Sequence, residues 1–250
     1  MNKDKVAIFV DWQNLYADLS KTRKRLEPSL TFDYNNIPHL TYFFHSFLTK
    51  HERLFRIFFY TAMPMSSGEL SKFINDTKRY QNSPELNAFQ TYWNTPLHLN
   101  DASSTPLAKQ EKNYTKAKEF QENLMKSNLY ALRLGQQRCQ NLEANGRPNL
   151  AQKQVDMLIG IDVSHVSFFK LVDTVIIFSK DTDMIPALKV ARVSGLQTII
   201  ASVGESGHPD IRLQKHSDFR RTRTLLDIDK EGKMDKWNFL AIKKSIASFK

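Results

Sequence analysis

Two short apolar runs constrain the fold of this 250-residue chain more than any other feature. Val6–Val10 and Thr174–Phe178 are almost wholly apolar and rich in β-branched side chains, and polar residues flank both runs. Such runs are typical of strands that are buried on both faces, as strands of parallel sheets are, whereas a strand with one wet face alternates apolar and polar residues. The two runs therefore predict a parallel sheet that is covered by helices on both sides.

Other segments with the periods of strands and helices alternate along the chain. We expect further strands at residues 54–61, 129–134 and 197–202, and an edge strand at 224–228. We expect helices at residues 37–51, 69–79, 114–128, 152–169 and 184–194. This alternation predicts an α/β fold with three layers, α/β/α, around a central and mostly parallel sheet.

The predicted domain spans residues 1–228 and is followed by a basic, helical tail at 229–250. Within it, residues 94–113 are poor in large apolar side chains and contain Pro96 and Pro106. This composition indicates a loop or an insertion, because it offers little for a core to bury.

The charge of the chain favours a polyanionic partner. Lys and Arg number 36 against 26 Asp and Glu, a formal charge of +10. Excess positive charge favours nucleic acid or an anionic surface, although a basic surface without any partner would have the same composition. The single cysteine, Cys139, excludes an intramolecular disulfide and a Cys-based zinc site, and suits a reducing compartment. No apolar run is long enough to cross a membrane, so we expect a soluble, cytoplasmic protein without a membrane partner.

Four aspartates follow strands or begin a helix in this pattern. Asp11 directly follows the first run, Asp181 and Asp183 come soon after Thr174–Phe178, and Asp156 lies near the start of the helix at 152–169. In open α/β sheets, ligands bind beyond the carboxyl ends of the strands. We therefore expect the four carboxylates to converge at one edge of the sheet.

Crowded carboxylates repel one another, and their pKa values rise unless a cation compensates. Mg²⁺ and Mn²⁺ prefer oxygen ligands, and one or two such ions can activate water and stabilise the leaving oxygen in phosphodiester hydrolysis. The pattern predicts that Asp11, Asp156, Asp181 and Asp183 are both metal ligands and catalytic residues.

Each aspartate also has a simpler structural explanation. Asp183 could cap the helix that begins at Met184, Asp156 could be a first-turn acid favoured by the helix dipole, and the other two could be turn residues. Asp162 lies six residues beyond Asp156, about 9 Å along the helix and about 120° around it. We expect Asp162 to be a buried, hydrogen-bonded structural residue rather than a ligand.

Polar and aromatic neighbours of the acids are candidates for contact with substrate. Lys153 could neutralise a carboxylate or touch phosphate, or be a solvated lysine at the helix start. Asn14 and Ser179 could orient a ligand or act as caps. Trp12, like Tyr16, could stack on a base, or Trp12 could simply pack at the sheet edge.

Three segments resemble the motifs of the NYN domain, a LabA-like family that is similar to PIN-domain nucleases. They are Phe9–Leu15, Lys153–Asp156 and Phe178–Pro186, and the resemblance extends over roughly residues 5–226. It implies a PIN-like (Rossmann-like) topology in which the first and fourth predicted strands are adjacent. It also implies metal-dependent ribonuclease activity, typically with Mg²⁺ or Mn²⁺, and RNA as the partner.

By this motif match the four aspartates inherit the acidic site, and Asn14 and Ser179 inherit supporting roles. The chain departs from the family at two positions, since Gln154 and Lys180 stand where a glycine is usual. Lys180 could restrict the approach of the backbone or contact phosphate.

Our leading interpretation is a metal-dependent endoribonuclease that hydrolyses RNA phosphodiester bonds. The alternative is an RNA-binding module with a PIN-like fold and little or no nuclease activity, although a pure binder would gain by losing negative charge beside phosphate. Candidate phosphate contacts are basic runs at residues 21–25, 220–223 and 243–244. A homodimer is one assembly that remains open.

Overall fold

The computed structural model describes residues 3–26, 30–97, 104–204 and 209–241. The chain forms two compact units. The first comprises Met1–Thr61, Asn123–Arg133 and Asp156–Lys250, and the second comprises Ala62–Glu122 and Leu134–Val155. The predicted tail residues 243–244 lie outside the described residues.

The first unit contains the parallel part of the sheet. Its strands are β1 (Asp4–Asp11), β2 (Glu52–Met63), β5 (Thr174–Phe178), β6 (Gln197–Val203) and β7 (Phe219–Arg223). The sheet has the order β4-β3-β2-β1-β5-β6-β7, and β1 pairs in parallel with both β2 and β5. The predicted α/β class and the adjacency of the first and fourth predicted strands are confirmed.

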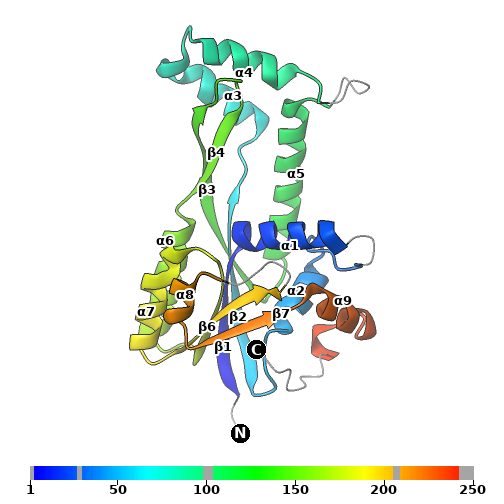
Figure 1. The fold of residues 1–250 in the computed structure, drawn as a ribbon, viewed down its shortest axis with the longest axis vertical. Helices are drawn as coiled ribbons and strands as arrows, with labels where there is room; N and C mark the ends of the chain where they lie inside the picture. The colour runs from blue at the N-terminus through cyan, green and yellow to red at the C-terminus, as the bar shows by residue number, and fades with distance from the viewer. Residues whose placement is uncertain (1–2, 27–29, 98–103, 205–208, 242–250) are drawn as a thin grey trace. The chain divides into compact units, whose positions relative to one another are not determined.

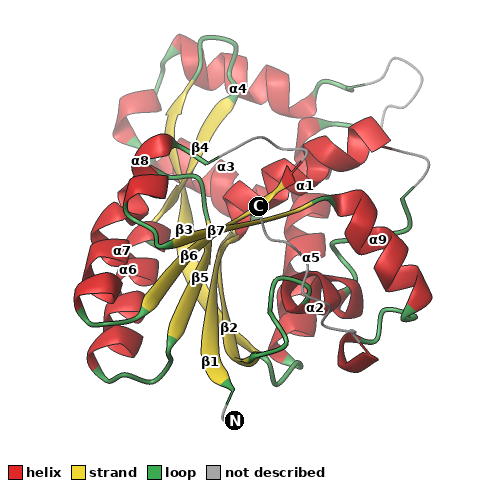
Figure 2. Ribbon diagram, turned by 60° about the horizontal axis from the view of Figure 1, so that its bottom comes forward, coloured by secondary structure: helices red, strands yellow, loops and turns green. Residues whose placement is uncertain are grey.

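Helices cover both faces of this sheet. In Figure 2, α6 (Val155–Phe168) and α7 (Ile185–Val193) lie on one face, whereas α2 (Ile37–His45) and α9 (Leu225–Met234) lie on the other. The other helical segments of this unit are α1 (Trp12–Leu26), the 3-10 turn η2 (Thr182–Met184), α8 (Ile211–Lys215) and η4 (Phe239–Ala241), and Figure 1 labels the main helices.

Aromatic side chains fill the core beneath the strand ends. Phe43, Phe44 and Phe47 of the α2 region surround Phe178 of β5, with ring centroids 5.7, 5.3 and 4.8 Å from it. All four rings are buried. Because Phe178 directly precedes the polar segment at 179–183, this packing fixes the point at which that segment leaves the sheet.

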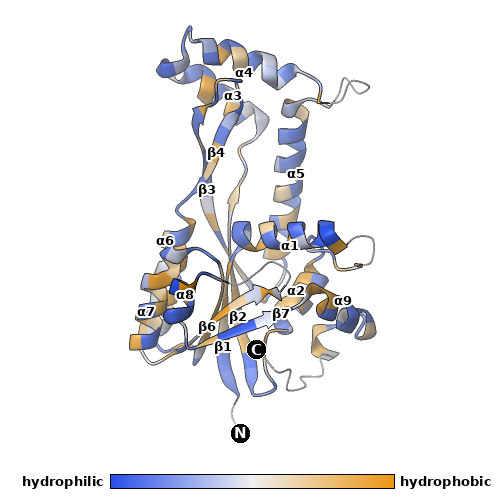
Figure 3. Cartoon of the chain, viewed as in Figure 1, coloured by the Kyte–Doolittle hydropathy of each residue, from blue (hydrophilic) through white to orange (hydrophobic). Residues whose placement is uncertain are grey.

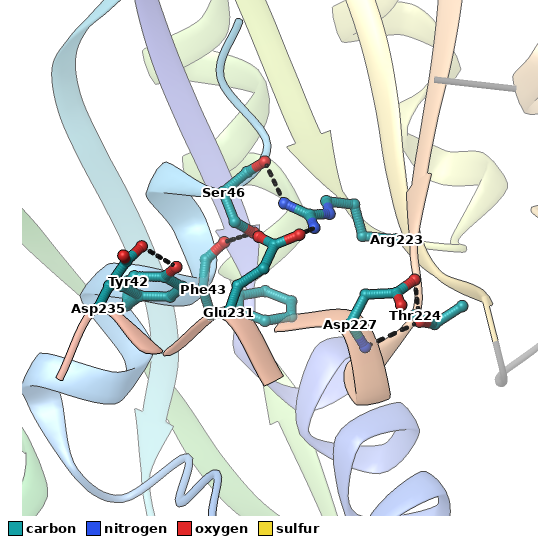
Figure 4. Close-up of polar contacts among 8 residues, drawn as sticks. All are labelled: Tyr42, Phe43, Ser46, Arg223, Thr224, Asp227, Glu231 and Asp235. Carbon is teal, nitrogen blue, oxygen red and sulfur yellow. Dashed lines mark hydrogen bonds and ion pairs between the residues drawn. The ribbon is translucent and has the colours of Figure 1, made fainter. Parts of the chain in front are cut away.

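Polar contacts attach the C-terminal helix to α2 (Figure 4). Arg223 donates hydrogen bonds to the carbonyl of Ser46, at 3.1 Å, and to the carboxylate of Glu231, and Tyr42 donates its hydroxyl to Asp235 at 2.7 Å. Thr224 caps α9 by accepting from the amide of Asp227. The expected edge strand at 224–228 is therefore wrong, because this cap starts a helix, and the edge strand is β7.

The second unit has a core of its own. Its elements are α3 (Ser67–Asp76), η1 (Lys78–Tyr80), α4 (Pro84–Asn94), most of α5 (Pro106–Met125), and an antiparallel hairpin formed by β3 (Tyr130–Leu142) and β4 (Pro148–Lys153). The core residues are Leu70, Ile74, Tyr80, Phe89, Trp93, Cys139 and Leu142.

Several expectations for this part of the chain are wrong. Residues 106–113 form the first turns of α5 rather than a loop, because Pro106 suits a helix start and Thr105 accepts a hydrogen bond from the amide of Ala108. The alternative that residues 94–113 are an insertion stays a prediction. Figure 3 shows that α5 is mostly hydrophilic, which is why its sequence resembles a loop. Residues 148–153 form a strand, and the helix expected from residue 152 begins at Val155. The predicted domain bounds stay a prediction, and α9 crosses the expected boundary after residue 228.

Candidate acidic site

Asp11 is the buried member of the site. It is the last residue of β1, and only 3% of it is exposed. Its Oδ1 accepts a hydrogen bond from the backbone amide of Asn14 at 3.3 Å, and its Oδ2 accepts from the Asn14 side-chain amide. Asn14 lies in the first turn of α1, so the helix that follows the strand fixes the orientation of this carboxylate.

Ser179 connects the two adjacent strand ends. Val10 of β1 pairs with Phe178 of β5, and this register places Asp11 beside Ser179. The Ser179 hydroxyl donates to Asp11 Oδ2 at 3.3 Å and accepts from the backbone amide of Asp181 at 3.1 Å. One buried hydroxyl therefore links the first strand to the segment that carries the next two acids.

Asp181 caps the short η2 helix. Its Oδ1 accepts a hydrogen bond from the amide of Asp183 at 2.9 Å. The capping role that we weighed for Asp183 thus belongs to Asp181, and α7 begins after Met184 without a side-chain cap. The Asp183 carboxylate is exposed and does not cap a helix.

Three carboxylates lie within ligand distance of one another. Asp156, Asp181 and Asp183 each offer one oxygen, and these oxygens all lie within 4.8 Å of one another. Asp156 is in the first turn of α6, as the sequence predicts. Asp11 is outside this group and is near enough for its charge to act on Asp156. The arrangement is three accessible acids with one buried acid nearby.

The charges of these acids act on one another. Burial raises the pKa of Asp11, and the charge of Asp181 raises it further, while the hydrogen bonds from Asn14 and Ser179 act in the opposite direction. Partial desolvation also raises the pKa of Asp156, although this residue is exposed, and so do the charges of Asp11, Asp181 and Asp183. A divalent cation fits such a donor set, because it would neutralise mutually repelling oxygens of the type that Mg²⁺ and Mn²⁺ prefer.

The side chains that the sequence predicts to contact substrate have different neighbours in the structure. Lys180 forms an ion pair with Asp18 of α1 at 2.8 Å, and Trp12 packs against the buried Phe59 with a centroid distance of 5.0 Å. Lys153 is the exposed last residue of β4, in the second unit. A role of these residues, or of Asn14 and Ser179, in binding substrate stays a prediction.

Asp18 was missed by the sequence analysis. It lies four residues after Asn14 and hence on the same face of α1, and this spacing was the available signal.

The junction before α6 has one unusual backbone angle and one close approach to a glycine of β3. Gln154 has a φ of 75°, in the left-handed region that favours glycine, and it stands where the NYN motif usually has glycine. A Cβ on Gly135 would lie 2.6 Å from the carbonyl oxygen of Lys153 and 2.7 Å from a methyl group of Val155. The chain thus places a glutamine in a backbone conformation that favours glycine.

Asp162 is hydrogen-bonded, as the sequence predicts, but it is half-buried rather than buried. Its Oδ2 accepts hydrogen bonds from the hydroxyl of Tyr60 and from Nε of Arg133, both at 2.8 Å. Burial and the charge of Asp162 raise the pKa of Tyr60, which keeps this donor protonated. These bonds engage Asp162 away from the three clustered acids.

Fold and site together define an α/β domain with a cluster of carboxylates beyond the ends of adjacent parallel strands. Residues 99–222 match the family model of the NYN domain, which confirms the family that the motifs resemble. The match includes Asp156, Asp181 and Asp183, whereas Asp11 and Asn14 precede it.

One solved structure is similar to the chain at low identity. It is the crystal structure of a protein of unknown function, VPA0982 from Vibrio parahaemolyticus RIMD 2210633, at 17% identity. The alignment covers 88% of this chain and 93% of that one, with a TM-score of 0.41. None of the curated proteins is significantly similar to the chain. Among the described residues, no helix is both long and apolar enough to cross a membrane.

Proposed function

We propose that the protein is a metal-dependent endoribonuclease that hydrolyses RNA phosphodiester bonds at the acidic site. The observation that carries the proposal is the convergence of ligand oxygens from Asp156, Asp181 and Asp183 within 4.8 Å of one another. The NYN domain match and the formal charge of +10 support RNA as the substrate.

The acids divide into two roles in this proposal. Asp156, Asp181 and Asp183 would hold Mg²⁺ or Mn²⁺, and Asp11 would complete the site directly or through water. A bound divalent cation supplies Lewis-acid chemistry, since it polarises a phosphoryl oxygen and lowers the pKa of water. Asn14 and Ser179 hold the Asp11 carboxylate through hydrogen bonds, and Ser179 also fixes the Asp181 backbone.

The positive and aromatic groups near the acids would bind the substrate. Lys180 and Lys153 would contact phosphate, and Trp12 would contact a base. Phosphate contacts of this kind provide affinity without sequence selection. We also propose a cytoplasmic location, which suits the single, unpaired Cys139. Neither the comparisons nor the described residues support a homodimer, and we propose none.

The test uses the purified protein with single-stranded or structured RNA and with Mn²⁺ or Mg²⁺. We expect cleavage in either metal and none with EDTA. Asp181→Asn should abolish cleavage and leave RNA binding equal or tighter, because it removes negative charge beside phosphate. The matched control, Asp76→Asn, removes an exposed acid of α3 and should cleave like the wild type.

Two outcomes contradict the proposal in different ways. An Asp181→Asn variant that cleaves like the wild type shows that the acids are not the catalytic site. A wild-type protein that binds RNA but cuts it with neither metal is the RNA-binding module of our alternative.

A further inference from the structure

A row of aromatic side chains begins beside the acidic site and follows α1. Trp12 directly follows Asp11, and its ring lies 5.7 Å from that of Tyr16 between centroids. Tyr16 lies 5.2 Å from Tyr34 in an edge-to-face pair, and the guanidinium carbon of Arg23 is 5.6 Å from the centre of the Tyr34 ring. We call Trp12, Tyr16, Tyr34 and Arg23 the aromatic row.

Three members of the row share one face of α1. Tyr16 is four residues and Arg23 eleven residues after Trp12, and both spacings return to the same side of a helix. Tyr34 comes from the segment that precedes α2 and lies against this face between the other members.

The row is held in place from behind. Trp12 packs on the buried Phe59 of β2, and Arg23 pairs with Asp33 at 3.6 Å. These contacts limit the rearrangement of the rings, so a ligand would meet them in a largely fixed order.

The rings nevertheless remain open to solvent. Tyr16 is 43% exposed, although it belongs to a cluster of aromatic rings, and Trp12 and Tyr34 are partly exposed. The cation of the row is Arg23 beside the Tyr34 ring, whereas the exposed Lys21 and Lys24 follow Trp12 by nine and twelve residues and lie on other faces of α1. Partly exposed rings beside a cation are the composition of surfaces that bind unpaired nucleotides, because bases stack on the rings while the cation contacts a phosphate.

We infer that the aromatic row binds unpaired nucleotides of RNA and leads a single strand to the acidic site. The inference rests on the proposed function for the identity of the ligand. In a duplex the faces of the bases are stacked on their neighbours and cannot reach the rings. The row therefore makes the protein select single-stranded RNA over duplex RNA.

The test measures binding without cleavage. A labelled ten-nucleotide oligoadenylate and an RNA duplex of equal length are titrated with the full chain in EDTA. Tyr16→Ala and Tyr34→Ala should each weaken oligoadenylate binding about thirtyfold, which is the middle of the range for the loss of one stacked base. Both should leave duplex binding within about twofold of the wild type.

Two further variants separate stacking from effects on folding. Tyr16→Phe and Tyr34→Phe keep the rings and should bind oligoadenylate like the wild type. Phe168→Ala removes a ring of α6 that is 69% exposed but outside the row, and it should change neither affinity. Thermal unfolding of each variant shows whether that variant is folded at the temperature of the binding titration.

The inference is overturned if the folded alanine variants bind oligoadenylate like the wild type, or if they lose single-strand and duplex binding equally. The first result assigns the row to packing of the segment before α2. The alanine variants could lose oligoadenylate binding as expected while the wild type never cleaves RNA with Mn²⁺. That pair of results would overturn the proposed function and leave this inference intact.

Discussion

At the scale of single residues, the backbone of Gln154 adopts a conformation that its side chain disfavours. Its φ of 75° lies in the left-handed region, which costs a non-glycine residue about 1–2 kcal/mol. Glycine removes this cost but loses more conformational entropy on folding, by roughly 0.5–1 kcal/mol. The motif's usual glycine is therefore expected to be slightly better here than the natural glutamine.

We predict that Gln154→Gly raises the free energy of unfolding by about 0.5–1 kcal/mol. Urea denaturation of the variant and the wild type provides the measurement. Gln152→Gly is the matched control, because Gln152 lies within β4 and glycine weakens a strand interior. Equal losses of stability in the two variants would show that φ at residue 154 is not a source of strain.

The pKa values of the acids predict how pH affects stability. Partial desolvation and the neighbouring acids raise the pKa of Asp156 in the folded chain. A carboxyl group with a raised pKa binds its proton more tightly in the folded state, so its contribution to stability falls as pH rises through the folded pKa.

Asp156→Asn should therefore stabilise the metal-free protein at neutral pH, and the gain should vanish as pH falls below the ordinary pKa of 3.8. The same variant should lose part of the increase in Tm that Mn²⁺ gives the wild type, since a ligand of the folded state raises stability. Thermal unfolding at a series of pH values, with EDTA or Mn²⁺, measures both effects. An Asp156→Asn variant that is less stable than the wild type in EDTA at neutral pH contradicts the prediction.

At the scale of elements, β5 is both a core strand and the support of the site. Its last residue, Phe178, is buried among Phe43, Phe44 and Phe47, and the segment with Ser179 and Asp181 starts immediately after it. We predict that Phe178→Ala lowers the free energy of unfolding by about 3–5 kcal/mol, because it removes a buried ring and leaves a cavity.

Urea denaturation tests this prediction. Phe168→Ala removes a ring that is 69% exposed and should change stability by less than about 0.5 kcal/mol. Comparable losses in the two variants would mean that the cluster around β5 does not anchor the strand.

The elements also differ in how far the sequence predicts them. Val6–Val10 and Thr174–Phe178 are unbroken apolar runs, and strands buried on both faces have that pattern whatever surrounds them. The four acids were chosen as candidates because three of them follow such runs and Asp156 begins a helix with apolar residues at helical spacing. The sequence predicts a helix at 114–128 and a strand at 129–134, which agree with most of α5 and with the start of β3. The rest of the hairpin of β3 and β4 was missed because part of it is exposed and polar, and the first turns of α5 were missed because their composition resembles a loop. The ion pair of Lys180 with Asp18 joins residues 162 positions apart, which a local pattern cannot predict.

At the scale of the whole molecule, the chain forms two compact units, and the domain of 228 residues with a tail that the sequence predicts stays a prediction. The core of the second unit combines residues from α3, α4 and the hairpin, and each of these segments is only weakly apolar. A unit of this kind becomes visible only when distant segments pack together. The acids were easier to select as candidates, because three of them follow strand ends that the parallel sheet brings to one edge.

The hydrogen bond between Ser179 and Asp11 joins residues 168 positions apart in the chain. A ribosome makes Asp11 early, but Ser179, Asp181 and Asp183 emerge only after most of the chain has been synthesised. During that interval β1 has no β5 beside it and the carboxylates cannot gather. If the protein cuts RNA as we propose, the growing chain cannot cut the messenger that encodes it until β5 and the segment after it have joined β1.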